Sequence, residues 1–125
     1  MKEEAPVTYR SLGRITKAFG YSLAGLRHAA SNESAFQQEL IVVAVMTIAC
    51  LLLPFDLLLT VLIVIGHFLI LIVELLNTAI ESLADKVCRD IDPLIKQTKD
   101  AGSAAVLLTI AAVGLLWVYA LFTLF

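Results

Sequence analysis

The chain has 125 residues, of which 60% are hydrophobic and 16% charged, and its formal net charge is −2. Its mean hydropathy is +0.92, whereas about a quarter of the residues of an average soluble domain are charged. This composition excludes an ordinary water-soluble enzyme, and we expect no nucleic-acid partner. We predict a single membrane domain over residues 1–125 whose surroundings are largely lipid.

Residues 11–31 are predicted to form an amphipathic helix. Apolar residues recur there every three or four positions, and basic residues lie off this stripe. Such a helix fits the membrane interface, with its apolar face toward lipid. The alternative is an ordinary amphipathic helix packed on a soluble core. The apolar positions are Leu12, Ile15, Phe19, Leu23 and Leu26, and the basic ones are Arg14, Lys17 and Arg27.

Three apolar stretches follow, and each is predicted to span a membrane. They cover residues 34–53, 57–84 and 101–124. Pro54 ends the first stretch, so that only a tight turn separates it from the second. The charged segment 85–100 is predicted to be a loop. The fold class is therefore an all-α membrane protein with one surface helix and three transmembrane helices.

The distribution of basic residues predicts the orientation. All nine Lys and Arg residues lie in the segments 1–32 and 85–100. The positive-inside rule places both segments in the cytoplasm and the C-terminus outside. Trp117 and Tyr119, near the end of the third span, are typical of aromatic residues at a membrane interface.

An acidic stripe enters the second span. At about 100° per residue, Glu74, Asn77, Glu81 and Asp85 share one helix face. A charge at bilayer depth costs roughly 2.5–3.5 kcal/mol, so such a stripe suggests that cations or protons meet it. His67 lies on the same face, two turns before Glu74, where we expect packing or an interhelical hydrogen bond rather than catalysis.

The chemistry of this face favours a hard cation. Glu33 and Glu39 begin the first span at the same membrane level, and Glu33 could meet Glu81 across a helix pair. Carboxylate ligands without accompanying His or Cys ligands suit Mg²⁺, and phosphate oxygens would complete the coordination shell of the ion. The sequence has neither a P-loop nor a GxGxxG motif. From the residues alone, phosphoryl transfer and ion transport are equally favoured.

Four segments carry a resemblance to a known family. The sequence resembles the prokaryotic integral-membrane diacylglycerol kinases from about Thr8 into the third span. That resemblance implies a homotrimer of three-span subunits that transfers the γ-phosphate of ATP to the hydroxyl of diacylglycerol, in the bacterial cytoplasmic (inner) membrane. The segments are RITKAFGYSLAGL (14–26), NESAFQQE (32–39), VELLNTAIESLAD (73–85) and KDAGSAAVL (99–107).

The resemblance also implies roles for individual residues. Glu74 would be the general base that takes the proton of the lipid hydroxyl, and Asn77 would orient the site. Glu33 and Glu81 would hold Mg²⁺ on the ATP phosphates. The remaining nucleotide contacts would be Arg14, Tyr21, Lys99 and Asp100, and the lipid side would comprise Arg14, Gln38, Glu39, Glu74 and Ser103.

Three positions depart from the family pattern. Ile91 and Asp92 stand where the family often has an aromatic–histidine pair, so Asp90 and Asp92 are nucleotide-binding candidates by location alone. Phe19 occupies a position that is often small. Two alternatives stay open: an undecaprenol kinase of the same family, and a small multidrug or proton-coupled transporter.

Overall fold

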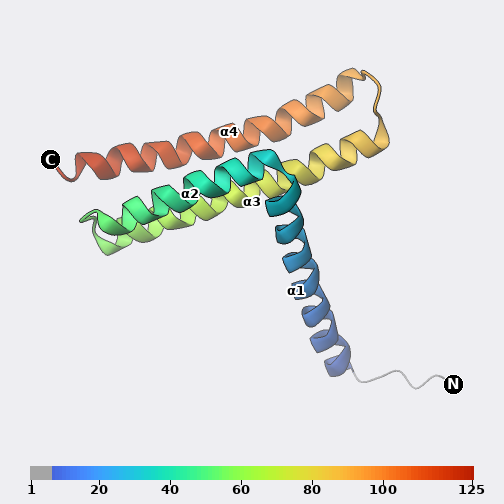
Figure 1. Cartoon of the computed structure of the whole chain (residues 1–125), viewed down its shortest axis with the longest axis horizontal. Coiled ribbons are helices and arrows are strands. Elements are labelled where there is room, and N and C mark those ends of the chain that lie inside the picture. The colour runs from blue at the N-terminus through green and yellow to red at the C-terminus, as the bar shows by residue number, and fades with distance from the viewer. Residues whose placement is uncertain (1–6) are drawn as a thin grey trace.

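The computed structural model describes residues 7–125, which form four helices. They are α1 (Val7–Asn32), α2 (Ser34–Leu52), α3 (Leu57–Val87) and α4 (Pro93–Phe122). Helices α2, α3 and α4 run side by side in alternating directions, and α1 leaves this bundle at a steep angle (Figure 1). The predicted fold class, one additional N-terminal helix and three helices of membrane-spanning character, is confirmed.

Each of α2, α3 and α4 is long and apolar enough to cross a membrane. Most of the large apolar side chains on these helices are exposed in the single chain, as expected when lipid or another subunit covers them. With 31 residues, α3 is about 46 Å long at ~1.5 Å per residue. Because a hydrocarbon core is only ~30 Å thick, part of α3 must extend beyond it.

The connection between α3 and α4 is shorter than the sequence predicts. The expected loop 85–100 is wrong, because α3 continues to Val87 and α4 already begins at Pro93. Proline suits the first turn of a helix, where its missing N–H costs nothing. The Asp92 side chain caps the same turn by accepting hydrogen bonds from the N–H groups of Leu94 and Ile95, at 2.8 and 3.2 Å.

The other boundaries differ by a few residues. Helix α1 begins at Val7 rather than at residue 11, and α4 ends at Phe122 rather than at residue 124. The tight turn between α2 and α3 is confirmed. There the side chain of Asp56 accepts a hydrogen bond from the N–H of Leu59 at 3.0 Å and so caps α3.

A polar network joins the three long helices away from the acidic stripe. The indole N–H of Trp117 on α4 donates to Nε2 of His67 on α3, at 3.0 Å. Because Nε2 accepts this bond, the proton of the neutral imidazole is on Nδ1, which lies 2.8 Å from the hydroxyl oxygen of Thr47 on α2. His67 is 3% exposed. Its expected interhelical hydrogen-bonding role is confirmed.

Trp117 is therefore more than an interfacial aromatic. It is partly buried, and its ring packs edge-on against Phe55 with the centroids 5.9 Å apart. Its indole N–H finds a partner inside the bundle. Tyr119 is exposed, and the membrane-interface location of both residues stays a prediction.

Thr47→Val should lower the free energy of unfolding by about 1 kcal/mol, since it removes an interhelical hydrogen bond and leaves His67 Nδ1–H without its partner. Reversible unfolding in mixed micelles measures the effect. Thr109→Val is the matched control, because the Thr109 hydroxyl donates only to the carbonyl of Ala105 on its own exposed helix face. Equal stability of the two variants would contradict the prediction.

Candidate active site at the acidic end of α3

Two polar residues of the acidic stripe are buried within a single chain. Glu74 is 4% exposed and Asn77 is 8% exposed. This face of α3 has partners within a single chain. Helix α4 packs along α3 and brings Gly102 against Asn77, while α2 brings Glu39 toward Glu74. The first half of the stripe, Glu74 and Asn77, therefore lies inside the bundle, whereas Glu81 is half-buried and Asp85 is exposed.

Asn77 links the two glutamates of the stripe. Its amide Nδ2 donates to Oε1 of Glu81 at 3.3 Å, and its side chain lies close enough to the Glu74 carboxylate to influence it. Among the described residues, no hydrogen-bond partner reaches its buried Oδ1 atom. The amide therefore lies between the two glutamates and orients the carboxylate of Glu81 directly.

Carboxylates from α2 converge on the same place. Glu33 occupies the N-cap position of α2 without a side-chain capping bond, and its Oε1 atom lies 3.9 Å from Nε2 of His28. Glu33 and Glu81 act electrostatically on Glu74, and Glu74 acts on Glu39. Oε2 of Glu39 is buried and has no hydrogen-bond partner in the part of the chain that the structure describes. This concentration of negative charge requires protons or cations to offset it.

The donor set fits a magnesium ion that is shared with a nucleotide. All of the candidate ligands are carboxylate oxygens, which Mg²⁺ prefers. Within residues 7–125, no group of three or more His, Cys, Asp or Glu side chains could hold a metal. Mg²⁺ commonly uses one or two carboxylates and takes its other ligands from substrate phosphates and water. Glu33 and Glu81 could supply the protein's share.

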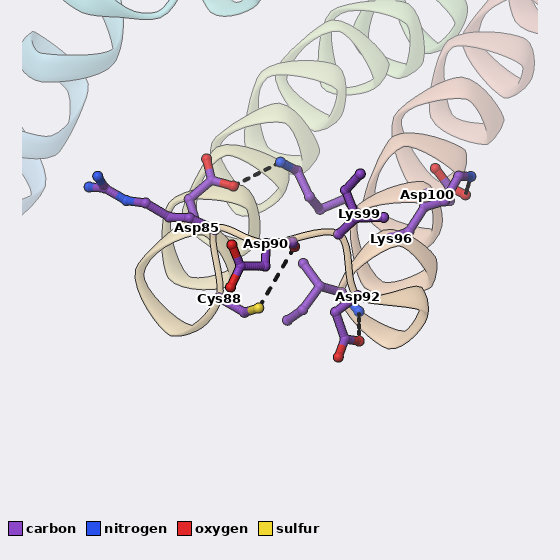
Figure 2. A pocket seen from close by; sticks show the side chains of 10 residues that line it. Asp85, Cys88, Asp90, Asp92, Lys96, Lys99 and Asp100 are labelled. Carbon is purple, nitrogen blue, oxygen red and sulfur yellow. Dashed lines mark hydrogen bonds and ion pairs between the residues drawn. The ribbon is translucent and has the colours of Figure 1, made fainter.

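A charged pocket of about 360 Å³ lies at the connection between α3 and α4. Figure 2 shows Lys99 reaching from α4 to Asp85 on α3, and their Nζ and Oδ1 atoms are 2.8 Å apart. Lys96 pairs with Asp100 at 2.6 Å on the rim. The pocket thus offers both cationic and anionic groups at the end of α3. Its lining residues are Asp85, Cys88, Arg89, Asp90, Ile91, Asp92, Ile95, Lys96, Lys99 and Asp100.

Four of the predicted nucleotide-binding residues meet in this pocket. They are Asp90, Asp92, Lys99 and Asp100. Asp92 also caps α4, so one of its oxygens is already engaged. Asp90 has no such capping role, although its backbone carbonyl lies 3.7 Å from the Cys88 thiol.

The predicted contacts on α1 lie elsewhere. Arg14 lines a separate pocket of about 370 Å³, with Ser11, Ile15 and Ala18. Tyr21 is 74% exposed. Gln38 on α2 and Ser103 on α4, the predicted lipid contacts, are exposed as well. One chain alone therefore does not gather all of the predicted residues.

A groove of about 560 Å³ lies between α1 and α3 and contains residues that were not predicted from the sequence. On α3, Thr78 and Ser82 face this groove, one turn apart. Their four-residue spacing beside the acidic stripe is the signal that could have found them. The other lining residues are Ser22, Gly25, Leu26, His28, Ala29, Leu75 and Ala79.

Fold and site together define a small helical membrane protein with buried carboxylates at one end of its bundle. Comparison with known sequences then identifies its family. Residues 20–121 match the family described as prokaryotic diacylglycerol kinase, and the chain belongs to that family.

Individual relatives agree with this family membership. A protein named diacylglycerol kinase from Escherichia coli (strain K12) is 41% identical over 83% of this chain and 85% of its own length. The diacylglycerol kinase of Pseudomonas aeruginosa is 40% identical over 85% of this chain and 86% of its own. The diacylglycerol kinase of Haemophilus influenzae is 34% identical over 87% and 94%, respectively. The similarity thus includes the candidate site and all three long helices.

Proposed function

We propose that this protein is an ATP-dependent lipid kinase that phosphorylates the hydroxyl of diacylglycerol and produces phosphatidic acid and ADP. Membership of the prokaryotic diacylglycerol kinase family supports the activity. The observation that carries the location of the site is the buried pair Glu74 and Asn77, with the half-buried Glu81 bonded to Asn77 and electrostatic neighbours on α2.

In this proposal, Glu74 is the general base. Its carboxylate takes the proton of the lipid hydroxyl, and the hydroxyl oxygen forms a bond to the γ-phosphorus as the bond to the bridging oxygen of ADP breaks. Burial of Glu74 within the bundle keeps bulk water away from this transfer. The proton then leaves Glu74 when phosphatidic acid is released, which restores the base.

The nucleotide would lie toward the ends of α3 and α4. Glu33 and Glu81 would hold Mg²⁺, which supplies charge neutralisation of the transferring phosphate when it is bound. Lys99 and Asp100 would contact the nucleotide, because they border the charged pocket at the end of α3. The other nucleotide contacts would be Asp90, Asp92, Arg14 and Tyr21, and the lipid contacts would be Gln38, Glu39, Ser103 and Arg14.

The bacterial cytoplasmic membrane is the proposed location, with the N-terminus and the α3–α4 connection on the cytoplasmic side. The positive-inside rule supports this orientation, since the C-terminal end and the turn after α2 carry no Lys or Arg. Because α2 begins and α3 ends at the same end of the bundle (Figure 1), Glu33 and Glu81 would then face cytoplasmic ATP.

The decisive experiment incubates detergent-purified protein with Mg²⁺ and γ-labelled ATP and with a panel of lipid alcohols. Labelled phosphatidic acid from diacylglycerol is the expected product. Preferential labelling of undecaprenol would show that the substrate is undecaprenol and not diacylglycerol. If no lipid led to ATP consumption, the proposed kinase activity would be contradicted and a proton-coupled transporter would be favoured.

A homotrimer with sites between subunits is the proposed assembly. Arg14 and Tyr21 lie outside the pocket that contains Lys99, so a nucleotide that meets both groups would need two chains. The expected mass in mild detergent is that of three chains. Mixing subunits that carry Arg14→Ala with subunits that carry Lys99→Met should restore part of the activity. A fully active monomer would contradict the assembly.

A further inference from the structure

Gly102 on α4 lies directly against the side chain of Asn77 on α3. A Cβ atom at position 102 would overlap Oδ1 of Asn77 and would lie 3.4 Å from its Cγ atom. The Gly102 backbone is buried at this crossing. Ile80, nearly one turn further along α3, would be an ordinary contact at 3.9 Å. The missing side chain therefore leaves space mainly for one amide group.

This close approach differs from those at the other glycines of α3 and α4. A Cβ atom at Gly66 would meet the Cγ2 methyl of Val113 at 2.9 Å, and one at Gly114 would meet nothing within 4 Å. Only at Gly102 is the obstructing atom part of the candidate active site. The constraint is therefore specific to Asn77 and is not a general need for small residues on α4.

Asn77 cannot move freely to make room. Its Nδ2 atom donates to Oε1 of Glu81, and its side chain lies beside the Glu74 carboxylate. A shift of the amide that makes room for a Cβ would weaken the bond to Glu81 and move the amide relative to Glu74, because hydrogen bonds depend steeply on geometry. The bond to Glu81 is already 3.3 Å long, which is beyond the usual range for an N–H···O bond, so a small further displacement would break it.

We propose that Gly102 is a positioning residue of the phosphoryl-transfer site, which acts by leaving the space in which the Asn77 amide orients Glu74 and Glu81. This inference rests on the proposed kinase function for its effect on turnover, whereas the packing between Gly102 and Asn77 is independent of that function. Residues that orient metal ligands or catalytic groups from behind typically change affinity or activity by about 10–100-fold when they are lost.

Gly102→Ala tests the proposal, and Gly114→Ala is its control. Gly102→Ala is expected to lower kcat by at least about tenfold and to weaken the binding of a non-hydrolysable Mg-ATP analogue, as measured by calorimetry. Gly114→Ala is expected to change neither, although it adds the same methyl group to the same helix. Equal losses in both variants, or no loss in Gly102→Ala, would overturn the proposal.

A double-mutant cycle with Asn77→Ala separates positioning from general packing. Without the Asn77 amide, the added methyl has no oxygen to overlap, so Gly102→Ala should cause no further loss of kcat and should no longer destabilise the fold. Rescue of folding by Asn77→Ala would support the overlap even if Gly102→Ala alone failed to fold. Independent, multiplicative losses of kcat, or unfolding of both variants, would overturn it.

The cycle also separates this proposal from the kinase activity itself. Wild-type protein that phosphorylates no lipid would remove the proposed function. The coupling between positions 102 and 77 would still be measured by the unfolding of the four proteins in the cycle. If the effects of the two substitutions on the free energy of unfolding were additive, Gly102 and Asn77 would not be coupled by packing, whatever reaction the protein catalyses.

Discussion

Glu74→Gln should keep the fold, the oligomeric state of the unchanged protein and the ability to bind Mg-ATP, yet lose at least about a hundredfold in kcat. Replacing a carboxylate by an amide of the same shape removes the group that accepts the hydroxyl proton, and general-base catalysis is typically worth about 10²–10⁴-fold. Because a base acts on the acceptor lipid, nucleotide affinity should change little. Stability should not fall, since Glu74 is 4% exposed and a buried carboxylate is costly.

The measurement combines phosphatidic acid formation and nucleotide binding on the same preparation. Asp56→Asn is a matched control on the opposite end of α3, where asparagine can still accept the hydrogen bond from the N–H of Leu59, and it should leave kcat unchanged. A Glu74→Gln variant that keeps its kcat but no longer binds nucleotide would make Glu74 a metal ligand. One that keeps both properties would remove it from the site.

Much of the fold follows from the sequence because lipid imposes simple requirements on spanning helices. Apolar runs of sufficient length identify α2, α3 and α4 without knowledge of their packing. The start of α4 escapes this reasoning, since its first two turns carry Lys96, Lys99 and Asp100 and resemble a charged loop. Local capping by Asp92 and Pro93 decides the structure there.

The candidate site is predictable in part for a related reason. Helical periodicity places Glu74, Asn77 and Glu81 on one face of α3, and alternating spans place Glu33 at the same end of the bundle. Periodicity does not reveal which neighbour covers that face. The close approach of α4 depends on the absence of a Cβ at Gly102, which changes the interpretation from a bare face to a buried one.

The hydrogen bonds of His67 show the same limit. Its place on α3 indicates an inward-facing side chain, but its partners, Thr47 and Trp117, come from two other helices and lie 20 and 50 positions away. Pairing over such distances depends on the rotation of each helix about its axis. The predicted contacts of Arg14 and Tyr21 depend in the same way on the angle at which α1 leaves the bundle (Figure 1).

Glu81→Gln should abolish most of the activity through weakened binding of Mg-ATP. Glutamine keeps an Oε1 atom that can accept the 3.3 Å hydrogen bond from Asn77, so the fold and the Asn77 amide should stay in place. The substitution removes only the negative charge that attracts Mg²⁺. Since outer-shell partners of a metal already contribute about 10–100-fold, loss of a direct ligand should weaken nucleotide binding at least tenfold.

Glu33→Gln should reproduce this effect from the other helix. The Glu33 side chain makes no capping bond at the start of α2, and Nε2 of His28 lies as far as 3.9 Å from its Oε1 atom, so its replacement should leave α2 intact. Titrating Mg²⁺ against both activity and binding of an ATP analogue tests the pair, and higher Mg²⁺ should restore part of the affinity in each variant. Wild-type activity at ordinary Mg²⁺ in either variant would remove that residue from the metal site, because a hard cation that loses one of two protein carboxylates cannot keep its affinity unchanged.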